Sequence, residues 1–123
     1  MTKILIVDDE IDVCDFVRHF FEERNYRVFT ALNSAEGLRL LRREKPHIML
    51  LDVKMSGIDG IETLKKARGF DKDVKVIMVT AVDDQASMKE AEKLGAARYI
   101  TKPLVLEDLE AAVLSYTKGL DNE

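Results

Sequence analysis

The strongest constraint on the fold is a repeated switch between two hydrophobic periods along the chain. Apolar runs of strand length occupy 4–7, 48–51 and 74–79, and two more mixed β-rich segments occupy 27–31 and 98–100. Each is followed by a segment whose apolar residues recur every three or four positions, the spacing of one face of an α-helix. Five strand–helix units in series predict a parallel sheet covered by helices on both faces.

The polarity of these strands indicates their order in the sheet. Central strands of a parallel sheet are buried on both faces and are largely apolar, as the runs at 4–7, 48–51 and 74–79 are. The mixed segment 27–31 and the short segment 98–100 suit the edges. We therefore predict an α/β, doubly wound, five-stranded parallel sheet in the order 2-1-3-4-5 with five helices, a flavodoxin-like arrangement.

Apolar stripes mark the five expected helices. Asn33, with Glu36 three residues later, resembles an N-terminal capping box, and Lys45-Pro46 ends the same helix. The fourth helix is the least apolar of the five. The stripes comprise Val13, Phe16, Val17, Phe20 and Phe21; Ala35, Leu38 and Leu41; Ile61, Leu64 and Ala67; Met88, Ala91 and Leu94; and Leu106, Leu109, Val113 and Tyr116. We expect the first stripe to lie in the core, with Phe16 nearest its rim.

Length and composition bound the class of protein. A chain of 123 residues with 46% hydrophobic and 34% charged residues is expected to form a single globular domain over 1–123. Its net charge of -4 argues against a nucleic-acid surface. Cys14 is the one cysteine, so the chain has no internal disulfide. We find neither a signal peptide nor an apolar run of membrane-spanning length, and we expect a cytoplasmic protein with no membrane partner.

Polar residues stand at the carboxyl ends of four expected strands. Asp8 and Asp9 follow the first strand, Asp52 the third, Thr80 the fourth and Lys102 the fifth. Ligands of open parallel sheets bind beyond this edge, so these side chains are expected to converge there. Each also has a simpler interpretation, since carboxylates cap helices and hydroxyls or lysines often end strands.

Three neighbouring carboxylates repel one another unless protons or a cation join them. Oxygen ligands without histidine or cysteine favour Mg²⁺ over Zn²⁺, and Mg²⁺ commonly binds one or two carboxylates together with a phosphate oxygen. A nearby lysine and threonine suit a phosphoryl group, and one carboxylate can act as the nucleophile. The set therefore favours metal-assisted phosphoryl transfer.

The segments KILIVDDE, LLDVKMSGIDG, VIMVTA and YITKP, in this order and spacing, resemble the receiver domain of bacterial-type response regulators. The resemblance covers essentially the whole chain. It implies a signalling phosphoacceptor rather than an enzyme, one that assists its own phosphorylation and dephosphorylation. Asp52 would accept a phosphoryl group from the phosphohistidine of a histidine kinase or histidine phosphotransfer protein, with Mg²⁺ or, in its place, Mn²⁺.

The resemblance also assigns roles to single residues. Besides Asp52, the metal ligands would be Asp9 directly, Asp8 mostly through water, and the main-chain carbonyl of Lys54. In the same way, the resemblance makes Thr80 the switch hydroxyl, Lys102 the phosphoryl-binding lysine, Tyr99 the switch aromatic, and the Lys102-Pro103 bond cis.

Two positions depart from the family pattern. The loop after Asp52 reads Met55-Ser56-Gly57 where the family usually has proline at the middle position, so a somewhat looser loop is expected. Val82, two residues after Thr80, is apolar and cannot orient a water molecule. We expect the phosphorylated state to last longer than in relatives with an acidic or amide residue there.

Output is expected from the face formed by the fourth helix, the fifth strand and the fifth helix, which would shift on phosphorylation and could form a homodimer. The phosphodonor is expected to approach over the first helix and the loop after Lys102. Its contact residues would be Ile11, Asp12, Val13, Phe16, Pro103 and Leu104.

Other readings fit less well. A dinucleotide-binding enzyme would have a glycine-rich turn after the first strand, where this chain has Asp8-Asp9-Glu10. An aspartate-nucleophile phosphatase would have a second aspartate at Lys54. We favour a stand-alone single-domain regulator; the alternative is a receiver domain from a longer regulator with a DNA-binding or enzymatic output.

Overall fold

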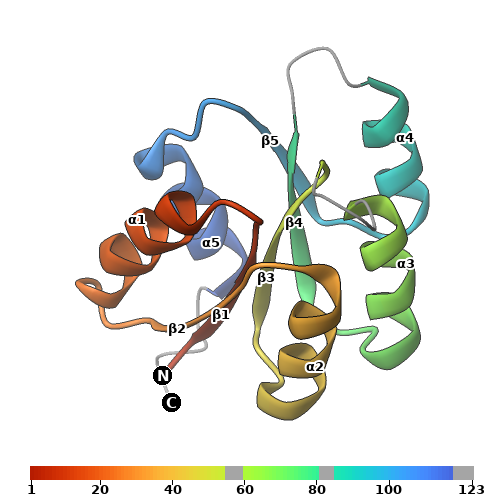
Figure 1. Cartoon of the computed structure of the whole chain (residues 1–123). Coiled ribbons are helices and arrows are strands. Elements are labelled where there is room, and N and C mark those ends of the chain that lie inside the picture. Colours follow the sequence, from red (N-terminus) through yellow and green to blue (C-terminus); the bar gives the residue numbers. More distant parts are fainter. Residues whose placement is uncertain (55–59, 81–84, 118–123) are drawn as a thin grey trace.

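The computed structural model of the chain describes residues 1–54, 60–80 and 85–117. Its sheet has five parallel strands in the order β2-β1-β3-β4-β5, which confirms the predicted topology (Figure 1). The elements are β1 (Lys3–Val7), α1 (Ile11–Glu22), β2 (Arg27–Ala31), α2 (Ser34–Glu44), β3 (Ile48–Asp52), α3 (Gly60–Phe70), β4 (Lys75–Thr80), α4 (Gln85–Lys93), β5 (Arg98–Thr101) and α5 (Leu106–Thr117).

The helices form two layers, one on each face of the sheet. Helices α1 and α5 cover one face, and α2, α3 and α4 cover the other (Figure 1). Alternate residues of a strand enter opposite cores: Leu5 packs with α2 and α3, and Ile6 packs with α1 and α5. This alternation is the two-residue period of a β-strand.

Burial separates the central strands from the edges as their composition predicts. All five residues of β3 are buried, and in β4 only Lys75 is exposed. Strands β2 and β5 are mixed, and β5 contains no fully buried residue. No helix in the described ranges is long and apolar enough to cross a membrane.

The ends of α2 follow the sequence signals. The Asn33 side chain accepts a hydrogen bond from the Glu36 main-chain N–H at 2.8 Å, as an N-cap should. Lys45 ends the helix in the left-handed conformation with φ 49°. Within the helix, a Cβ atom on Gly37 would lie 2.8 Å from Cγ2 of Val7, so glycine allows α2 to approach β1 closely.

Two residues of the expected apolar stripes are not in the core. Phe16 is 59% exposed, because Cys14, Val17 and Phe21 form the buried stripe of α1 and Phe16 lies outside it. Ala35 is exposed for the same reason, since Gly37 and its neighbours on the buried face meet the sheet. The prediction of core positions was therefore wrong for these two side chains.

Candidate functional site

Three polar side chains end adjacent central strands at the carboxyl edge of the sheet. Asp8 directly follows β1, Asp52 is the last residue of β3, and Thr80 is the last residue of β4. Their exposed fractions are 4%, 3% and 1%, respectively. Polar groups buried this deeply need partners. The three side chains are therefore enclosed by the protein at this edge, where the sequence placed them, and do not lie on the solvent-exposed surface.

Lys102 provides the charged partner of Asp52. Its Nζ donates to Oδ2 of Asp52 at 3.2 Å, and Oδ1 of Asp52 accepts from the Lys54 main-chain N–H, also at 3.2 Å. The main-chain N–H of Lys102 donates to the Thr80 carbonyl at 2.8 Å, which fixes the segment after β5 against the end of β4. The Lys102-Pro103 peptide bond is cis, which confirms the expectation.

The close packing of α3 holds the backbone after Asp52 in place. The Gly60 N–H donates to the Val53 carbonyl at 2.6 Å. A Cβ atom on Gly60 would collide with the main-chain oxygen of Asp52. Only glycine lets the first residue of α3 sit this close to the strand end.

A compact acidic group lies beside the pair. Carboxylate oxygens of Asp8, Asp9 and Glu10 all lie within 4.8 Å of one another. The Glu10 main-chain N–H donates to Oδ1 of Asp8 at 2.9 Å. Glu10 was not among the predicted metal ligands, although its place directly after the two aspartates was a usable signal. Asp52 is not part of this group in the described chain; its carboxylate pairs with Lys102 instead.

Burial and mutual repulsion disturb the titration of these groups. Burial raises the pKa of Asp52, and the Lys102 ammonium partly opposes that rise. Burial also raises the pKa of Asp8, and the Asp52 carboxylate adds to it. Burial alone would lower the pKa of Lys102, but the charge of Asp52 and its hydrogen bond raise it above the ordinary value. Keeping these carboxylates ionised at the carboxyl edge is thus unfavourable in free energy, and a bound cation would reduce that unfavourable free energy.

The donor set fits a hard divalent cation. The acidic group offers carboxylate oxygens and, among the described residues, neither histidine nor cysteine joins it. Such oxygen ligands suit Mg²⁺ or Mn²⁺. Cys14 lies close by, with its Sγ donating to the Asp8 carbonyl at 3.4 Å, but burial raises the pKa of its thiol to about 11. A thiol with this pKa is a poor metal ligand and nucleophile at neutral pH.

The predicted switch tyrosine is the second residue of β5 and faces a hollow shared with α4. Tyr99 is partly buried and lines a hollow of about 360 Å³ together with Met88 and Glu92 of α4 and with Thr101. Its hydroxyl oxygen is buried and has no hydrogen-bond partner within the described ranges. Tyr99 is therefore placed where a displacement of α4 would change its surroundings.

The predicted docking residues flank the carboxyl edge. Val13 and Leu104 line a small internal cavity together with Asp8 and Asp52. Ile11 is 57% exposed, and Asp12 and Pro103 are exposed as well. With the exposed ring of Phe16, they form an accessible, partly apolar rim. Met55, Ser56, Gly57 and Val82 lie outside the described residues.

Comparison with known proteins identifies the class of protein to which this fold and this edge belong. Residues 4–114 match the family described as the response regulator receiver domain. The chain therefore belongs to the receiver-domain family of two-component response regulators, which are signalling proteins whose general role is to accept phosphoryl groups.

Curated relatives include proteins of two lengths. The chain is 35% identical over 114 residues to the sporulation initiation phosphotransferase F of Bacillus subtilis, covering 93% of this chain and 92% of that protein. It is 35% identical over 112 residues to the transcriptional regulatory protein CrdR of Helicobacter pylori, covering 90% of this chain but 53% of the relative. The chain thus spans about half the length of this second relative.

Solved structures agree on the fold. A CheY-like response regulator receiver domain protein from Methanospirillum hungatei superposes with a TM-score of 0.90 and 31% identity, covering 94% of this chain and 92% of that one. A two-component response regulator from Clostridium difficile superposes with a TM-score of 0.91 and 29% identity, covering 98% of both chains.

Proposed function

We propose that Asp52 accepts a phosphoryl group from the phosphohistidine of a histidine kinase or histidine phosphotransfer protein. The observation that carries this proposal is a 3%-exposed carboxylate paired with Lys102 beside a compact acidic group. A carboxylate oxygen of Asp52 attacks phosphorus while the phosphorus–nitrogen bond breaks, and the electron pair of that bond stays on the imidazole of the donor, which ends neutral by taking up a proton.

The proposed metal is Mg²⁺, with Mn²⁺ as a substitute. Asp8, Asp9, Asp52 and the main-chain carbonyl of Lys54 would hold it, and it would supply positive charge against the transferring group. The raised pKa values of Asp8 and Asp52 support a cation here. Glu10 is the third member of the acidic group, and its side chain is exposed to solvent.

Lys102 and Thr80 would bind the transferred phosphoryl group. The Lys102 ammonium already reaches Asp52, so it needs little movement to pair with a phosphoryl oxygen. The Thr80 hydroxyl would donate to a second oxygen. Because the main chains of the two residues are hydrogen-bonded, their side chains are positioned together.

The signal would leave through α4, β5 and α5, the face we propose also for a homodimer of the phosphorylated protein. Helix α4 has one buried residue, Ala91, so little packing resists its displacement. Tyr99 would turn inward as Thr80 meets the phosphoryl group. Unchanged hydrogen exchange across 85–101 after phosphorylation would contradict this proposal.

The phosphodonor would dock on the rim formed by Ile11, Asp12, Val13, Phe16, Pro103 and Leu104. Exposed apolar side chains such as Ile11 and Phe16 support a protein contact there. Alanine variants should slow transfer from the donor protein but leave phosphorylation by acetyl phosphate unchanged. Equal slowing with both donors would instead point to damage at Asp52.

Intact mass after incubation with Mg²⁺ and acetyl phosphate is the direct test. The wild-type protein should gain one phosphoryl group, and neither the Asp52→Asn variant nor the wild type in EDTA should gain it. Labelling of Asp52→Asn to the same extent as wild type would refute the assignment. If wild type gains nothing, binding of Mg²⁺ and beryllofluoride distinguishes a donor-specific receiver from one that works without phosphorylation.

The lifetime of the phosphorylated state is expected to be long. Val82 has no group to orient an attacking water molecule. The Val82→Glu and Val82→Gln variants should therefore lose phosphate faster than wild type. Equal rates of loss would contradict this expectation.

We further propose that residues 1–123 act as one stand-alone cytoplasmic receiver domain without direct nucleic-acid or membrane binding. The Bacillus subtilis relative, matched over 92% of its length, supports this organisation. The alternative is a receiver within a longer regulator with a DNA-binding or enzymatic output. The apparent mass of the native protein on an immunoblot decides between them.

A further inference from the structure

A hollow away from the carboxyl-edge carboxylates lies between α2 and α3. It has a volume of about 980 Å³ and is lined by four cationic side chains, three apolar ones and Ser34. The cationic residues, which we call the basic face, are Arg39, Arg42, Arg43 and Lys66, and the apolar ones are Ala35, Leu38 and Phe70. No carboxylate among the described residues lines this hollow, although the whole chain carries a net charge of -4.

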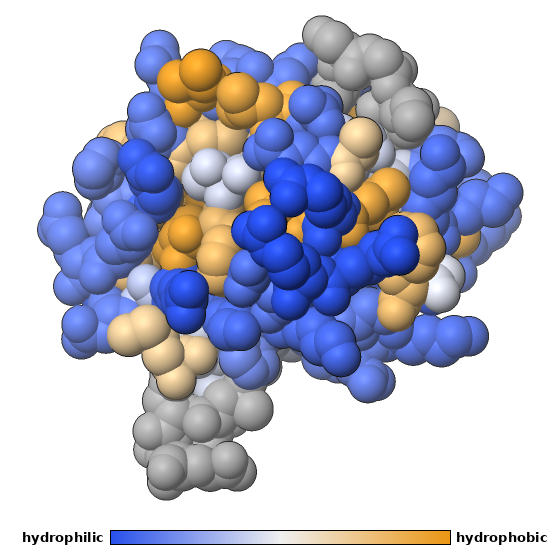
Figure 2. Space-filling view, turned by 60° about the horizontal axis from the view of Figure 1, so that its bottom comes forward, coloured by the Kyte–Doolittle hydropathy of each residue, from blue (hydrophilic) through white to orange (hydrophobic). Residues whose placement is uncertain are grey.

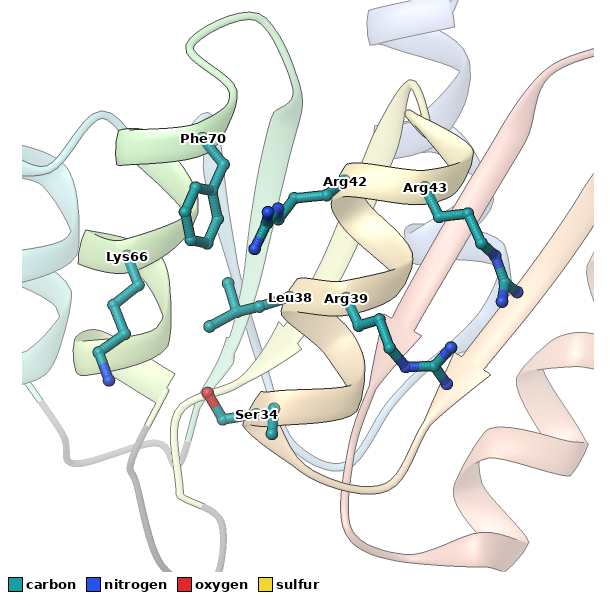
Figure 3. A pocket seen from close by; sticks show the side chains of 8 residues that line it. Ser34, Leu38, Arg39, Arg42, Arg43, Lys66 and Phe70 are labelled. Carbon is teal, nitrogen blue, oxygen red and sulfur yellow. The ribbon is translucent and has the colours of Figure 1, made fainter.

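The apolar part of the hollow is accessible. Phe70 is 51% exposed, and the Arg42 guanidinium lies 4.8 Å from its ring centroid. Figure 3 shows Leu38 and Arg42 pointing from α2 towards α3, where Lys66 and Phe70 stand. Figure 2, which brings the lower end of Figure 1 forward, shows strongly hydrophilic residues gathered beside hydrophobic ones. A charged surface with an apolar strip is therefore available to a partner.

A hydrogen bond joins α2 and α3 at the Ser34 end of the hollow. The Thr63 hydroxyl of α3 donates to Oγ of Ser34 in α2 at 2.8 Å, and both residues are buried. A second hollow of about 330 Å³ shares Arg42 and Phe70 with the first. The Arg42–Phe70 stack thus stands between two depressions and is accessible from both.

The cations have few partners inside the chain. Arg43 pairs with Glu44 at 2.8 Å. Across the ranges that the structure describes, Arg39, Arg42 and Lys66 form no ion pair within 4.0 Å. An acidic partner could therefore pair with them without breaking an existing bridge.

The arrangement distinguishes between kinds of anion. A single small anion needs donors that converge, whereas Arg39 and Arg43 point away from α3 (Figure 3). A stacked nucleobase would have to share the Phe70 ring with the Arg42 guanidinium, which already covers one of its faces. An amphipathic segment instead needs cations spread along a groove with an apolar strip inside it, which is what α2 and α3 provide.

We propose that the α2–α3 hollow is a docking site for an acidic protein segment that inserts an apolar side chain between Leu38 and Phe70. Its carboxylates would pair with the basic face. This site is separate from the rim that would meet the phosphodonor and from the α4-β5-α5 face, and it does not depend on phosphorylation.

The test uses the full chain and a synthetic amphipathic helical peptide with glutamates on one face and leucines at i and i+4 on the other. Binding is measured by fluorescence anisotropy and by amide chemical shifts. We expect shifts concentrated in α2 and α3, and binding that weakens with added salt. Arg42→Glu, and separately Lys66→Glu, should weaken it about tenfold. No binding, or equal binding by these variants, overturns the proposal.

Arg24→Glu is the matched control. Arg24 also covers a phenylalanine ring, that of Phe20 at 3.6 Å, but it lies in the turn after α1 and pairs with Glu110 of α5, so it belongs to the opposite face of the sheet. It should leave binding within about twofold of wild type. An equal loss in Arg24→Glu would mean non-specific charge attraction and would overturn the proposal. Circular dichroism of each variant confirms that it is folded.

Three further probes separate the kinds of ligand. Replacing both leucines of the peptide by serine should weaken binding; unchanged affinity would overturn the apolar contact. A single-stranded oligonucleotide of equal charge should bind more weakly than the peptide, and tighter binding would favour nucleic acid over protein. Inorganic phosphate should not compete with the peptide at matched ionic strength, and competition would reduce the site to a general anion site.

Discussion

The two ends of the sheet are built by opposite rules. At the amino end, polar groups satisfy one another: the Lys3 N–H donates to Nδ1 of His47 at 3.0 Å, and Nζ of Lys3 donates to the Glu44 carbonyl at the end of α2, also at 3.0 Å. At the carboxyl end, Asp8 and Asp52 are buried near each other with raised pKa values. One end of the sheet therefore stabilises the fold, while the other keeps charges in an unfavourable arrangement that a ligand would relieve.

Arg68 of α3 also satisfies main-chain polar groups, as Lys3 does at the amino end of the sheet. Its guanidinium donates to the Val74 carbonyl and to the Gly95 carbonyl, each at 2.7 Å. It thereby joins α3, the start of β4 and the turn after α4 through main-chain acceptors. Lys102, the corresponding half-buried cation of the carboxyl end, bonds instead to a carboxylate that we propose as the nucleophile.

The largest expected effect is on the carboxyl end. Lys102→Met should slow phosphorylation of Asp52 by acetyl phosphate about 100- to 1,000-fold, because it removes a positive charge from beside the transferring group. Thermal unfolding should show the variant folded. The comparison would fail if Arg68→Met, which removes a cation from the other end, slowed the reaction as much.

Arg68→Met should instead lower the free energy of unfolding by about 1–3 kcal/mol, because the main-chain carbonyls of Val74 and Gly95 lose a charged hydrogen-bond donor. Urea denaturation measures the change. Lys65→Met, an exposed substitution on the same helix, should alter stability by less than about 0.5 kcal/mol. Similar losses in both variants would show that Arg68 acts only through its surface charge.

The third effect depends on pH and metal. The folded protein raises the pKa of Asp8, so its contribution to stability is fully present below the unfolded pKa of about 3.9 and is lost as the pH rises through the folded value. Without divalent cation at neutral pH, Asp8→Asn should therefore unfold at a higher temperature than wild type. The gap should close at acidic pH.

Mg²⁺ supplies the check on this prediction. It should raise the melting temperature of wild type more than that of Asp8→Asn, because it binds the charged form of the site. Equal Mg²⁺ responses would separate Asp8 from the metal. The Asp12→Asn variant, which changes an exposed carboxylate on α1, should behave as wild type.

The smallest effect is expected at the amino end of β3. His47→Ala removes the acceptor for the Lys3 N–H, a group near water, and should cost about 1 kcal/mol or less. Phosphorylation of Asp52 should be unchanged. A fall in the phosphorylation rate would mean that the two ends of the sheet are coupled.

The sequence predicted the carboxyl end better than the amino end for a physical reason. Strand composition distinguishes central strands from edge strands. In a parallel sheet, the residue that follows each strand lies at the same edge. Asp8, Asp52, Thr80 and Lys102 could therefore be brought together from local signals alone. Arg68 could not, because its acceptors are main-chain carbonyls, which any residue type carries.

The basic face was missed for a related reason. Arg39 and Arg42 have the pattern of an ordinary solvated helix face, and Phe70 follows them by about thirty positions in the sequence. Only the packing of α2 beside α3 brings them together. The same dependence on packing explains Phe16 and Ala35, whose helical spacing gave no measure of how wide the buried stripe would be.

The bonds from Arg68 determine how α4 can move. They hold the chain just beyond the last turn of the helix, at Leu94 and Gly95. A displacement of α4 that keeps these bonds is a tilt about its carboxyl-terminal end. The amino-terminal end of the helix then moves the furthest. For the nine residues of α4, about 13 Å long, a tilt of about 10° would carry the amino-terminal end about 2 Å. When residues beside Thr80 rearrange, the resulting displacement of α4 would thus be largest at the start of the helix and nearly absent at its end.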